Sequence, residues 1–401
     1  MKIFIAIPAL DELDYLPVLM EDLMAQAYND FAIFVCVNNP DIWWNDSEKR
    51  GQCENNSETL EYLKNIDNMN ITLIDKSSKG HGWKGKAKGV GFARKELFEA
   101  INKAADEDDL IISLDADTGI EPSYIASVRK QFIKNKQALL LANSYYHKLT
   151  GNESNDRAIL RYELYMRYYL INLLKINSPY AFSALGSAIS FRMKGYRKIN
   201  GITPKEAGED FYFVNRMKKA GDILIFNDQA VYPSSRESDR VPFGTGPAVI
   251  KGQKGDWDSY PFYDIETFRR IGETYELFPK LFLQDCETPI DDFIGNSLGE
   301  NIWEPLRKNF KTEKLFIRAC HEKIDGLRIL QILRFYQKDE SLANFIKFGR
   351  EELFIELQND FTFESSSVEK LDEIRNIYFM REMETRERIN SPQISARKKI
   401  I

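Results

Sequence analysis

The chain has 401 residues, a formal net charge of −6, three histidines and four cysteines. The acidic balance argues against a general nucleic-acid binder, so we expect no nucleic-acid partner, and so few histidines argue against a zinc site. The cysteines form neither a CxxC pair nor a disulfide framework. No apolar run is long enough to span a bilayer, and residues 3–7 begin a strand directly after Met1 and Lys2, with no room for a signal peptide. We therefore expect a soluble, cytoplasmic protein.

Short apolar runs alternate with amphipathic segments through the first 142 residues. Residues 3–7 predict a buried strand, Asp11 is a candidate cap for a helix over residues 12–27, and residues 31–37 predict a second strand. The next elements are helix 60–66, strand 71–74, helix 90–105, strand 110–114, helix 124–135 and a segment at 138–142 that continues the alternation. Strands that alternate with helices predict right-handed crossovers and a mainly parallel sheet.

A basic segment, KSSKGHGWKGKAKGVGFARK, covers residues 76–95 and contains no acidic residue. Its lysines, arginine and glycines favour binding of a phosphate ahead of the following helix, and a solvated basic loop is the alternative. Gly80 and Gly85-Lys86 have P-loop spacing, but Ala87 stands where that motif needs a hydroxyl. A nucleoside-triphosphatase therefore remains a second hypothesis.

The segment DLIISLDAD, residues 109–117, predicts the central strand of the sheet, buried on both faces. It ends in Asp115 and Asp117, which are two residues apart and so face the same side of an extended chain. Ligands of open α/β sheets bind beyond the carboxyl ends of the strands. Two carboxylates there suit Mg²⁺ or Mn²⁺ shared with a diphosphate; helix-capping aspartates are the alternative.

A second informative region follows an aromatic-rich helix predicted over residues 156–176. Residues 188–191 predict a strand, and residues 210–219 predict an amphipathic helix that ends at Gly221. Glu209 and Asp210 then stand at a helix N-terminus, where the helix dipole lowers a carboxylate pKa. We expect this effect to keep Asp210 ionised as a general base at neutral pH, with a structural N-cap as the alternative.

Three of these segments together resemble family-2 glycosyltransferases with the glycosyltransferase A-type (GT-A) fold. IPALDELDYLPVLMEDL resembles the first strand, nucleotide loop and helix of that family, and SLDADTGIEPSYI resembles its DxD element. LGSAISFR, followed by GITPKEAGEDFYFVNRMKKAG, resembles its acceptor segment and ED motif. The resemblance covers roughly residues 1–250.

The resemblance implies transfer of a glycosyl group from a nucleotide diphosphate sugar to a hydroxyl of a sugar, a lipid-linked or another acceptor. Asp117 would hold Mn²⁺ or Mg²⁺, Asp115 would contact the ribose or the water shell of the metal, and Asp210 would be the base of an inverting reaction. Glu209 would orient the acceptor or the base. The implied nucleotide contacts are Pro8, Leu10, Asp11, Asn39 and Lys86.

The sequence departs from the family pattern at three places. Asn38-Asn39 stands where many members have an aspartate that reads uracil, so the donor base stays open, and the absence of a QxxRW motif predicts a non-processive enzyme. Residues 234–246 offer Arg236, Asp239 and Arg240 in place of a histidine metal ligand. We expect this loop to close over the donor diphosphate, and a surface salt-bridge loop is the alternative.

The expected organisation is an α/β GT-A domain over residues 1–250, a linking loop over 251–264 and a helical C-terminal extension over 265–401. The extension is expected to shape the acceptor side or an oligomer contact. The oligomeric state stays open, and a non-catalytic nucleotide-sugar-binding relative is a third hypothesis.

Overall fold

The computed structural model describes residues 1–85, 88–206, 208–240, 244–299, 301–338 and 340–390. The chain divides into two compact units. The first unit contains Met1–Ile159 and Ser183–Lys251, and the second contains Leu160–Phe182 and the residues from Gly252 onward. Among the described helices, none combines the length and apolar composition that crossing a membrane requires.

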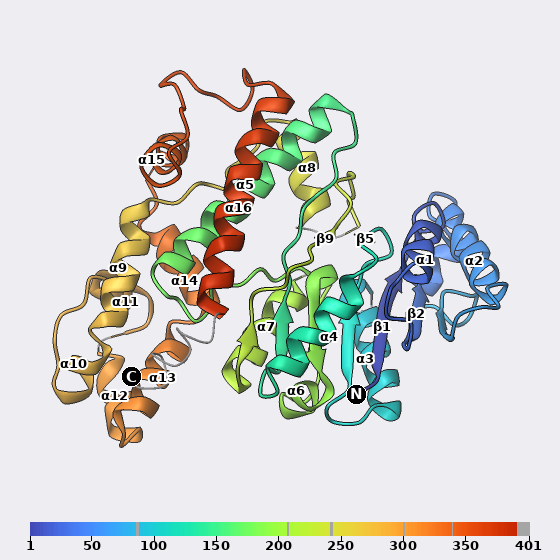
Figure 1. Ribbon diagram of the computed structural model, residues 1–401, viewed down its shortest axis with the longest axis horizontal. Helices are drawn as coiled ribbons and strands as arrows, with labels where there is room; N and C mark the ends of the chain where they lie inside the picture. Colours follow the sequence, from blue (N-terminus) through green and yellow to red (C-terminus); the bar gives the residue numbers. More distant parts are fainter. Residues whose placement is uncertain (86–87, 207, 241–243, 300, 339, 391–401) are drawn as a thin grey trace. The chain divides into compact units, whose positions relative to one another are not determined.

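The first unit is built on a seven-stranded sheet with the order β3-β2-β1-β4-β7-β6-β8 (Figure 1). The strands are β1 (Ile3–Ala9), β2 (Ala32–Asn38), β3 (Ile71–Lys76), β4 (Leu110–Ser113), β6 (Leu140–Ala142), β7 (Ile189–Arg192) and β8 (Ile223–Leu224). Only β7 is antiparallel to its neighbours. The predicted mainly parallel sheet is therefore confirmed. Two short strands, β5 (Gly119–Ile120) and β9 (Val231–Tyr232), pair separately beside it.

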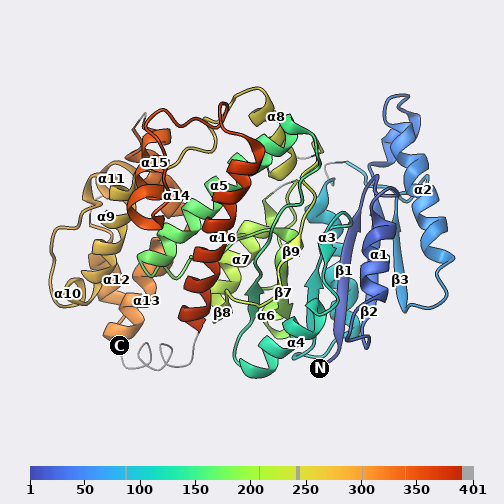
Figure 2. The same ribbon diagram turned by 45° about the horizontal axis from the view of Figure 1, so that its top comes forward.

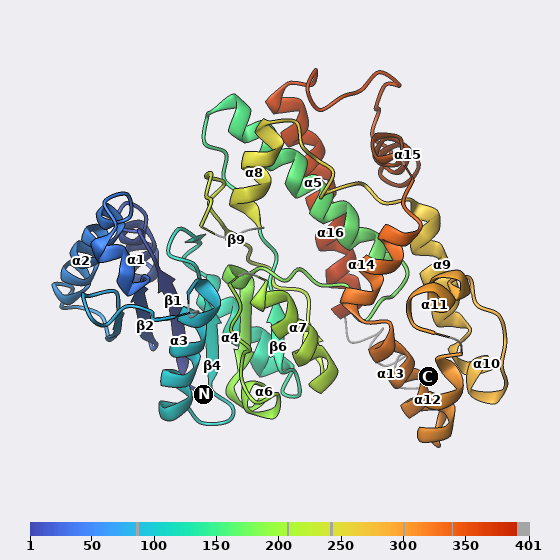
Figure 3. The same ribbon diagram turned by 180° about the vertical axis from the view of Figure 1, so that it is seen from behind.

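The two strands at the centre of the sheet are apolar because helices cover both of their faces. Every residue of β1 and β4 is buried, and Ile5, Ile7 and Ile112 have no exposed surface. Helix α3 packs on β1 and β2 (Figure 3). Helix α3 covers Val90–Ala104. Apart from α5, described below, the other helices that begin in this unit are α1 (Leu16–Met24), α2 (Arg50–Lys64), α4 (Tyr124–Lys134), α6 (Met193–Lys198), α7 (Glu209–Ala220) and α8 (Thr245–Gln253), and its 3₁₀ turns are η1 (Asp41–Asn45) and η2 (Gly186–Ala188).

The first helix differs from its prediction, because Asp11 is not its cap. Helix α1 begins at Leu16, and Asp11 adopts a left-handed conformation with φ 58°. The backbone N–H of Asp11 donates to Asn56 Oδ1 at 2.9 Å, which ties this segment to α2 instead. Helix α2 is also longer than predicted, because it buries the polar side chain of Asn56 between Cys53 and Leu60 and so has a weak apolar pattern.

The second unit is helical, as predicted for the C-terminal extension. Helix α5 (Glu153–Lys175) begins in the first unit and ends in the second. The remaining helices are α9 (Ile265–Glu276), α10 (Phe278–Leu283), α11 (Asp291–Ser297), α12 (Trp303–Asn309), α13 (Glu313–Lys323), α14 (Gly326–Phe335), α15 (Ser341–Leu353) and α16 (Val368–Asn390). Residues 160–182, which the sequence analysis assigned to the first domain, group with these helices.

Buried ion pairs explain why the later part of α5 belongs with α16, which runs beside it (Figure 2). Arg167 pairs with Glu163 at 2.6 Å on its own helix and with Glu382 of α16 at 2.7 Å. Glu382 also pairs with Arg386 at 2.7 Å, and none of these four side chains is exposed. Separating these ion pairs would leave buried charges without a partner, which is energetically costly. The pair between Arg167 and Glu382 therefore holds α5 and α16 together.

Candidate functional site

Two carboxylates lie just beyond the end of β4, as the sequence predicts for a ligand site. Asp115 and Asp117 follow the last strand residue, Ser113, by two and four positions. The side chain of Asp115 is 37% exposed and that of Asp117 is 17% exposed. Both are partly accessible, and each pairs with a different arginine.

Arg94 connects Asp115 to the acidic pair at the start of α7. Its Nη2 donates to Asp115 Oδ1 at 2.5 Å, and its Nη1 donates to Glu209 Oε1. The Arg94 side chain is 3% exposed and that of Glu209 is 1% exposed. Burial alone would lower the pKa of Arg94, but the carboxylates of Asp115, Glu209 and Asp210 raise it, so the guanidinium stays charged. The two predicted acidic pairs therefore belong to one cluster.

A glycine lets the Arg94 guanidinium reach this position. A Cβ atom at Gly186, in η2, would collide with Arg94 Nη2. At the start of α3, a Cβ atom at Gly91 would likewise collide with the carbonyl oxygen of Lys205. Gly91 thus lets α3 lie close to the segment before α7, a role that its place in a basic, glycine-containing stretch did not reveal.

Asp210 is a half-buried residue, and two backbone N–H groups orient its carboxyl group. Gly186 N–H donates to its Oδ2 at 2.9 Å, and Phe211 N–H donates to its Oδ1 at 2.7 Å. Burial raises the pKa of Asp210 to about 7, the neighbouring Glu209 charge adds to this rise, and Arg94 opposes it. The expectation of a lowered pKa was wrong, because loss of solvation outweighs the helix dipole here. The N-cap of α7 is Gly208, at φ 71°, rather than either acid.

The second carboxylate after β4, Asp117, pairs with Arg236, which follows β9. Arg236 Nη2 lies 2.9 Å from Asp117 Oδ2, and it also donates to both carboxylate oxygens of Glu12 at 2.6 and 2.7 Å. Its guanidinium lies 4.0 Å from the centre of the Tyr15 ring. Burial raises the pKa of Asp117, the nearby Asp115 charge adds to the rise, and Arg236 lowers it.

Arg240 binds the segment that follows β1. Its Nη1 donates to the Leu10 carbonyl at 2.6 Å and to Glu12 Oε1 at 2.5 Å. Burial raises the pKa of Glu12 to about 7, and the charge of Asp117 contributes to the rise. Both predicted arginines thus contact the site instead of forming an isolated surface loop. Glu12 was not among the predicted site residues, and its position beside Asp11 in the loop after the first strand was the available signal.

The remaining predicted nucleotide contacts have different environments. Pro8 is buried within β1. Asn39 has no exposed surface; its side chain donates to the Pro40 carbonyl at 3.1 Å and accepts from Asn56 at 2.8 Å. A contact from its side chain to a base would require breaking these bonds, so Asn39 has a structural role here. Lys86 lies outside the described residues.

The carboxylates beyond β4 fit one kind of metal site. The described residues contain no group of three histidine, cysteine or acidic side chains able to hold a metal alone. Mg²⁺ and Mn²⁺ bind through one or two carboxylates together with substrate phosphates. Asp115 and Asp117 would supply these two carboxylates. To bind the cation, Asp117 would give up its contact with Arg236. The donor set therefore fits a cation shared with a diphosphate.

Comparisons with known proteins give remote matches in structure alone. No family model matches the sequence, and no curated protein matches it. TarS 1-349 of S. aureus in complex with UDP-GlcNAc is 13% identical, with a TM-score of 0.41, over 100% of this chain and 92% of that chain. Mannosyltransferase PcManGT of Pyrobaculum calidifontis, in complex with GDP-Man and Mn²⁺, is 10% identical, with a TM-score of 0.35, over 97% and 88%.

A third match is glucosyl-3-phosphoglycerate synthase of Mycobacterium tuberculosis in complex with Mn²⁺, UDP and phosphoglyceric acid. It is 12% identical, with a TM-score of 0.39, over 65% of this chain and 81% of that chain. At these identities and TM-scores we transfer no residue role or substrate from these proteins to this chain.

Proposed function

We propose that the chain transfers a glycosyl group from a nucleotide diphosphate sugar to an acceptor hydroxyl, with inversion at the anomeric carbon. The contact of Arg94 with both Asp115 and Glu209 is the observation that supports this best. A displacement at a sugar carbon needs a donor-holding group and a base on opposite sides of one carbon. Arg94 brings candidates for both roles, Asp115 and Asp210, into one cluster.

Asp210 is the proposed general base. The acceptor oxygen forms a bond to the anomeric carbon while the bond from that carbon to the diphosphate oxygen breaks, and the acceptor proton passes to a carboxylate oxygen of Asp210. A pKa of about 7 suits this role, since the group is partly ionised at neutral pH and accepts a proton well. The N–H groups of Gly186 and Phe211 orient the carboxylate, and Glu209 holds Arg94 in place.

The donor diphosphate is proposed to lie beside Asp115 and Asp117. These residues would hold Mn²⁺ or Mg²⁺, which supplies charge neutralisation of the leaving nucleoside diphosphate. Arg236 and Arg240 stand next to Asp117 and Glu12, where their guanidinium groups suit bidentate phosphate recognition. Leu10 and Asp11 remain candidates for the nucleoside pocket, with Lys86 as a further diphosphate contact.

The two other hypotheses have weaker support. In a P-loop the helix follows the lysine and its neighbouring hydroxyl residue directly, whereas Ala87, Lys88 and Gly89 separate Lys86 from the start of α3 at Val90. A non-catalytic nucleotide-sugar binder would have no need of a carboxyl group that has a raised pKa and is oriented by the backbone, as in Asp210. The raised pKa and the fixed orientation of Asp210 therefore favour a catalytic protein over a binding protein.

Release of nucleoside diphosphate from a panel of UDP- and GDP-sugars with Mn²⁺, in the presence of candidate sugar and lipid-linked acceptors, tests the proposal. Sugar-dependent release that Asp210→Asn reduces by roughly 10²–10⁴-fold would support it. The control is Asp228→Asn, which changes a half-exposed acid paired with Lys130 at 3.8 Å. Phosphate release from ATP would favour the nucleoside-triphosphatase, and donor binding without turnover would favour the non-catalytic relative.

A further inference from the structure

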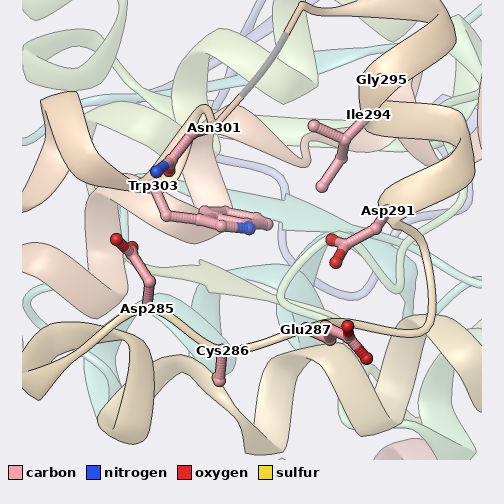
Figure 4. Close-up of a pocket in the computed structure, with 8 residues that line it drawn as sticks. All are labelled: Asp285, Cys286, Glu287, Asp291, Ile294, Gly295, Asn301 and Trp303. Carbon is pink, nitrogen blue, oxygen red and sulfur yellow. The ribbon is translucent and has the colours of Figure 1, made fainter.

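The second unit contains a pocket of about 450 Å³ that the proposed transfer reaction does not use (Figure 4). It lies among the loop after α10, helix α11 and the start of α12. Its polar and apolar lining includes Asp285, Glu287, Asp291, Ile294, Asn301 and Trp303. Small-molecule sites commonly have volumes of about 300–1,000 Å³, so the pocket is large enough for a ligand.

Trp303 contributes a hydrogen-bond donor that has no partner within the part of the chain that the structure describes. Its side chain is 4% exposed and packs against Phe278 with ring centres 5.6 Å apart. The indole N–H is buried and unpartnered. Figure 4 shows the indole ring reaching into the space between Asp285 and Asp291. Because a buried tryptophan N–H usually has an acceptor, a ligand for this pocket should offer one.

The rest of the polar lining consists mainly of acceptors. Asp285 pairs with Arg307 at 2.5 Å, which leaves the charges of Glu287 and Asp291 without a cationic partner among the described residues. The carboxylate of Asp291 accepts from the backbone and hydroxyl of Thr288 at 2.9 and 2.5 Å and is therefore fixed in place. A carboxylate has about four acceptor positions, so Asp291 can still accept from a ligand. This lining repels anions and attracts hydrogen-bond donors.

We infer that this pocket binds a non-anionic saccharide unit. Hydroxyl groups both donate and accept, so one sugar ring satisfies the Trp303 N–H and the carboxylates together. Ile294 and Trp303 contribute the apolar part of the lining. A phosphorylated or carboxylated sugar is excluded by the acidic lining. The inference needs no transfer activity, because it depends only on residues of the second unit.

Cys286 allows a direct binding test, because it lines the pocket and the other three cysteines are buried. The rate at which a maleimide labels the full-length protein is measured with glucose, glucosamine or glucose 6-phosphate, and Cys286→Ser identifies the labelled thiol. Glucose or glucosamine should slow labelling, and glucose 6-phosphate should not. Slowing by glucosamine alone would identify an amino sugar as the ligand class.

Trp303→Phe keeps an aromatic ring but removes the donor, and should weaken protection by roughly 2- to 12-fold, the range for one hydrogen bond. Asp117→Asn, in the first unit, should leave protection unchanged even if it abolishes transfer, so the two proposals fail separately.

Absence of protection by all three sugars, stronger protection by glucose 6-phosphate, or equal protection in Trp303→Phe would overturn the inference. Glu287→Gln, which changes an exposed side chain, repeats the test if Trp303→Phe does not fold. It should weaken protection by glucosamine, measured as the ratio of the labelling rates of this variant with and without sugar, because the neighbouring charge also affects the rate of the thiol itself.

Discussion

Replacing Arg94 with methionine tests whether this arginine holds the two acidic pairs together. The change preserves much of the side-chain volume but leaves Glu209, which is 1% exposed, without its cation. Removing one partner of a buried ion pair destabilises a protein by roughly 3–5 kcal/mol. Asp115 adds little to this loss, because it is more than one third exposed and water can solvate it. We therefore expect a loss of roughly 3–5 kcal/mol in the first unit.

The loss should depend on pH. In the variant the Asp210 carboxylate loses the Arg94 charge that lowers its pKa, so the native state favours the protonated form of Asp210 while the unfolded chain releases this proton at lower pH. Stability then falls as the pH rises, and the difference from the unmodified protein is larger at pH 8 than at pH 5.5. A second change, Glu209→Gln, should recover part of the loss at pH 8, since it removes the buried charge.

Native-state hydrogen exchange of peptides from α3 and α7 is the suitable measurement, because it reports the stability of these elements separately in a chain of two units. Arg50→Met is the matched control: Arg50 forms an exposed pair with Glu54 at 2.9 Å, which should contribute at most about 1 kcal/mol. A loss for Arg94→Met as small as that of the control, or one that is independent of pH, would refute the reasoning.

Three further changes test the proposed reaction. Asp210→Asn should reduce transfer by roughly 10²–10⁴-fold and leave donor binding intact, measured by product formation and calorimetry; lost donor affinity with an unchanged rate would contradict the role. Because the pKa of Asp210 is raised to about 7, and only its ionised form accepts a proton, kcat/KM should rise as the pH increases through about 7, and a flat profile would exclude it as the base. Asp117→Asn should abolish Mn²⁺-dependent turnover, and unmodified rates across a Mn²⁺ titration would refute the metal role. Gly186→Ala should displace Arg94 and reduce both activity and exchange protection in α3, whereas unchanged protection would show that the arginine tolerates the added methyl group.

The positions of the acidic pairs were predictable from the sequence because each follows a strong local pattern. The run before Asp115 is apolar because β4 is buried on both faces, and it ends where polar residues begin. The helix after Asp210 has an amphipathic pattern that identifies its start within one residue. Local patterns of this kind depend only on neighbouring residues and remain readable without a structure.

The arginine partners were not predictable in the same way. Arg94 lies 21 residues from Asp115 and 115 residues from Glu209 along the chain, and nothing local distinguishes it from the basic residues around it. Its burial follows from the place of α3 against the sheet. The burial of Arg167 likewise depends on Glu382, 215 residues away. Long-range pairing of charges is a property of the tertiary structure, and a single sequence does not encode it in any spacing.

The two arginines that bind the carboxylates after β4 differ in a way that matters for the proposed reaction. Arg94 is almost fully buried and cannot move without leaving the buried Glu209 carboxylate unpaired, so it holds Asp115 and Glu209 in fixed positions. Arg236 is 20% exposed, and Glu12 can retain it when Asp117 changes partner. The contacts of Arg94 with Asp115 and Glu209 are therefore rigid. The contact of Arg236 with Asp117, only two residues away from Asp115, can be replaced. In the proposed reaction, donor binding would therefore replace one contact, that of Arg236 with Asp117, and would leave the positioning of Asp210 unchanged.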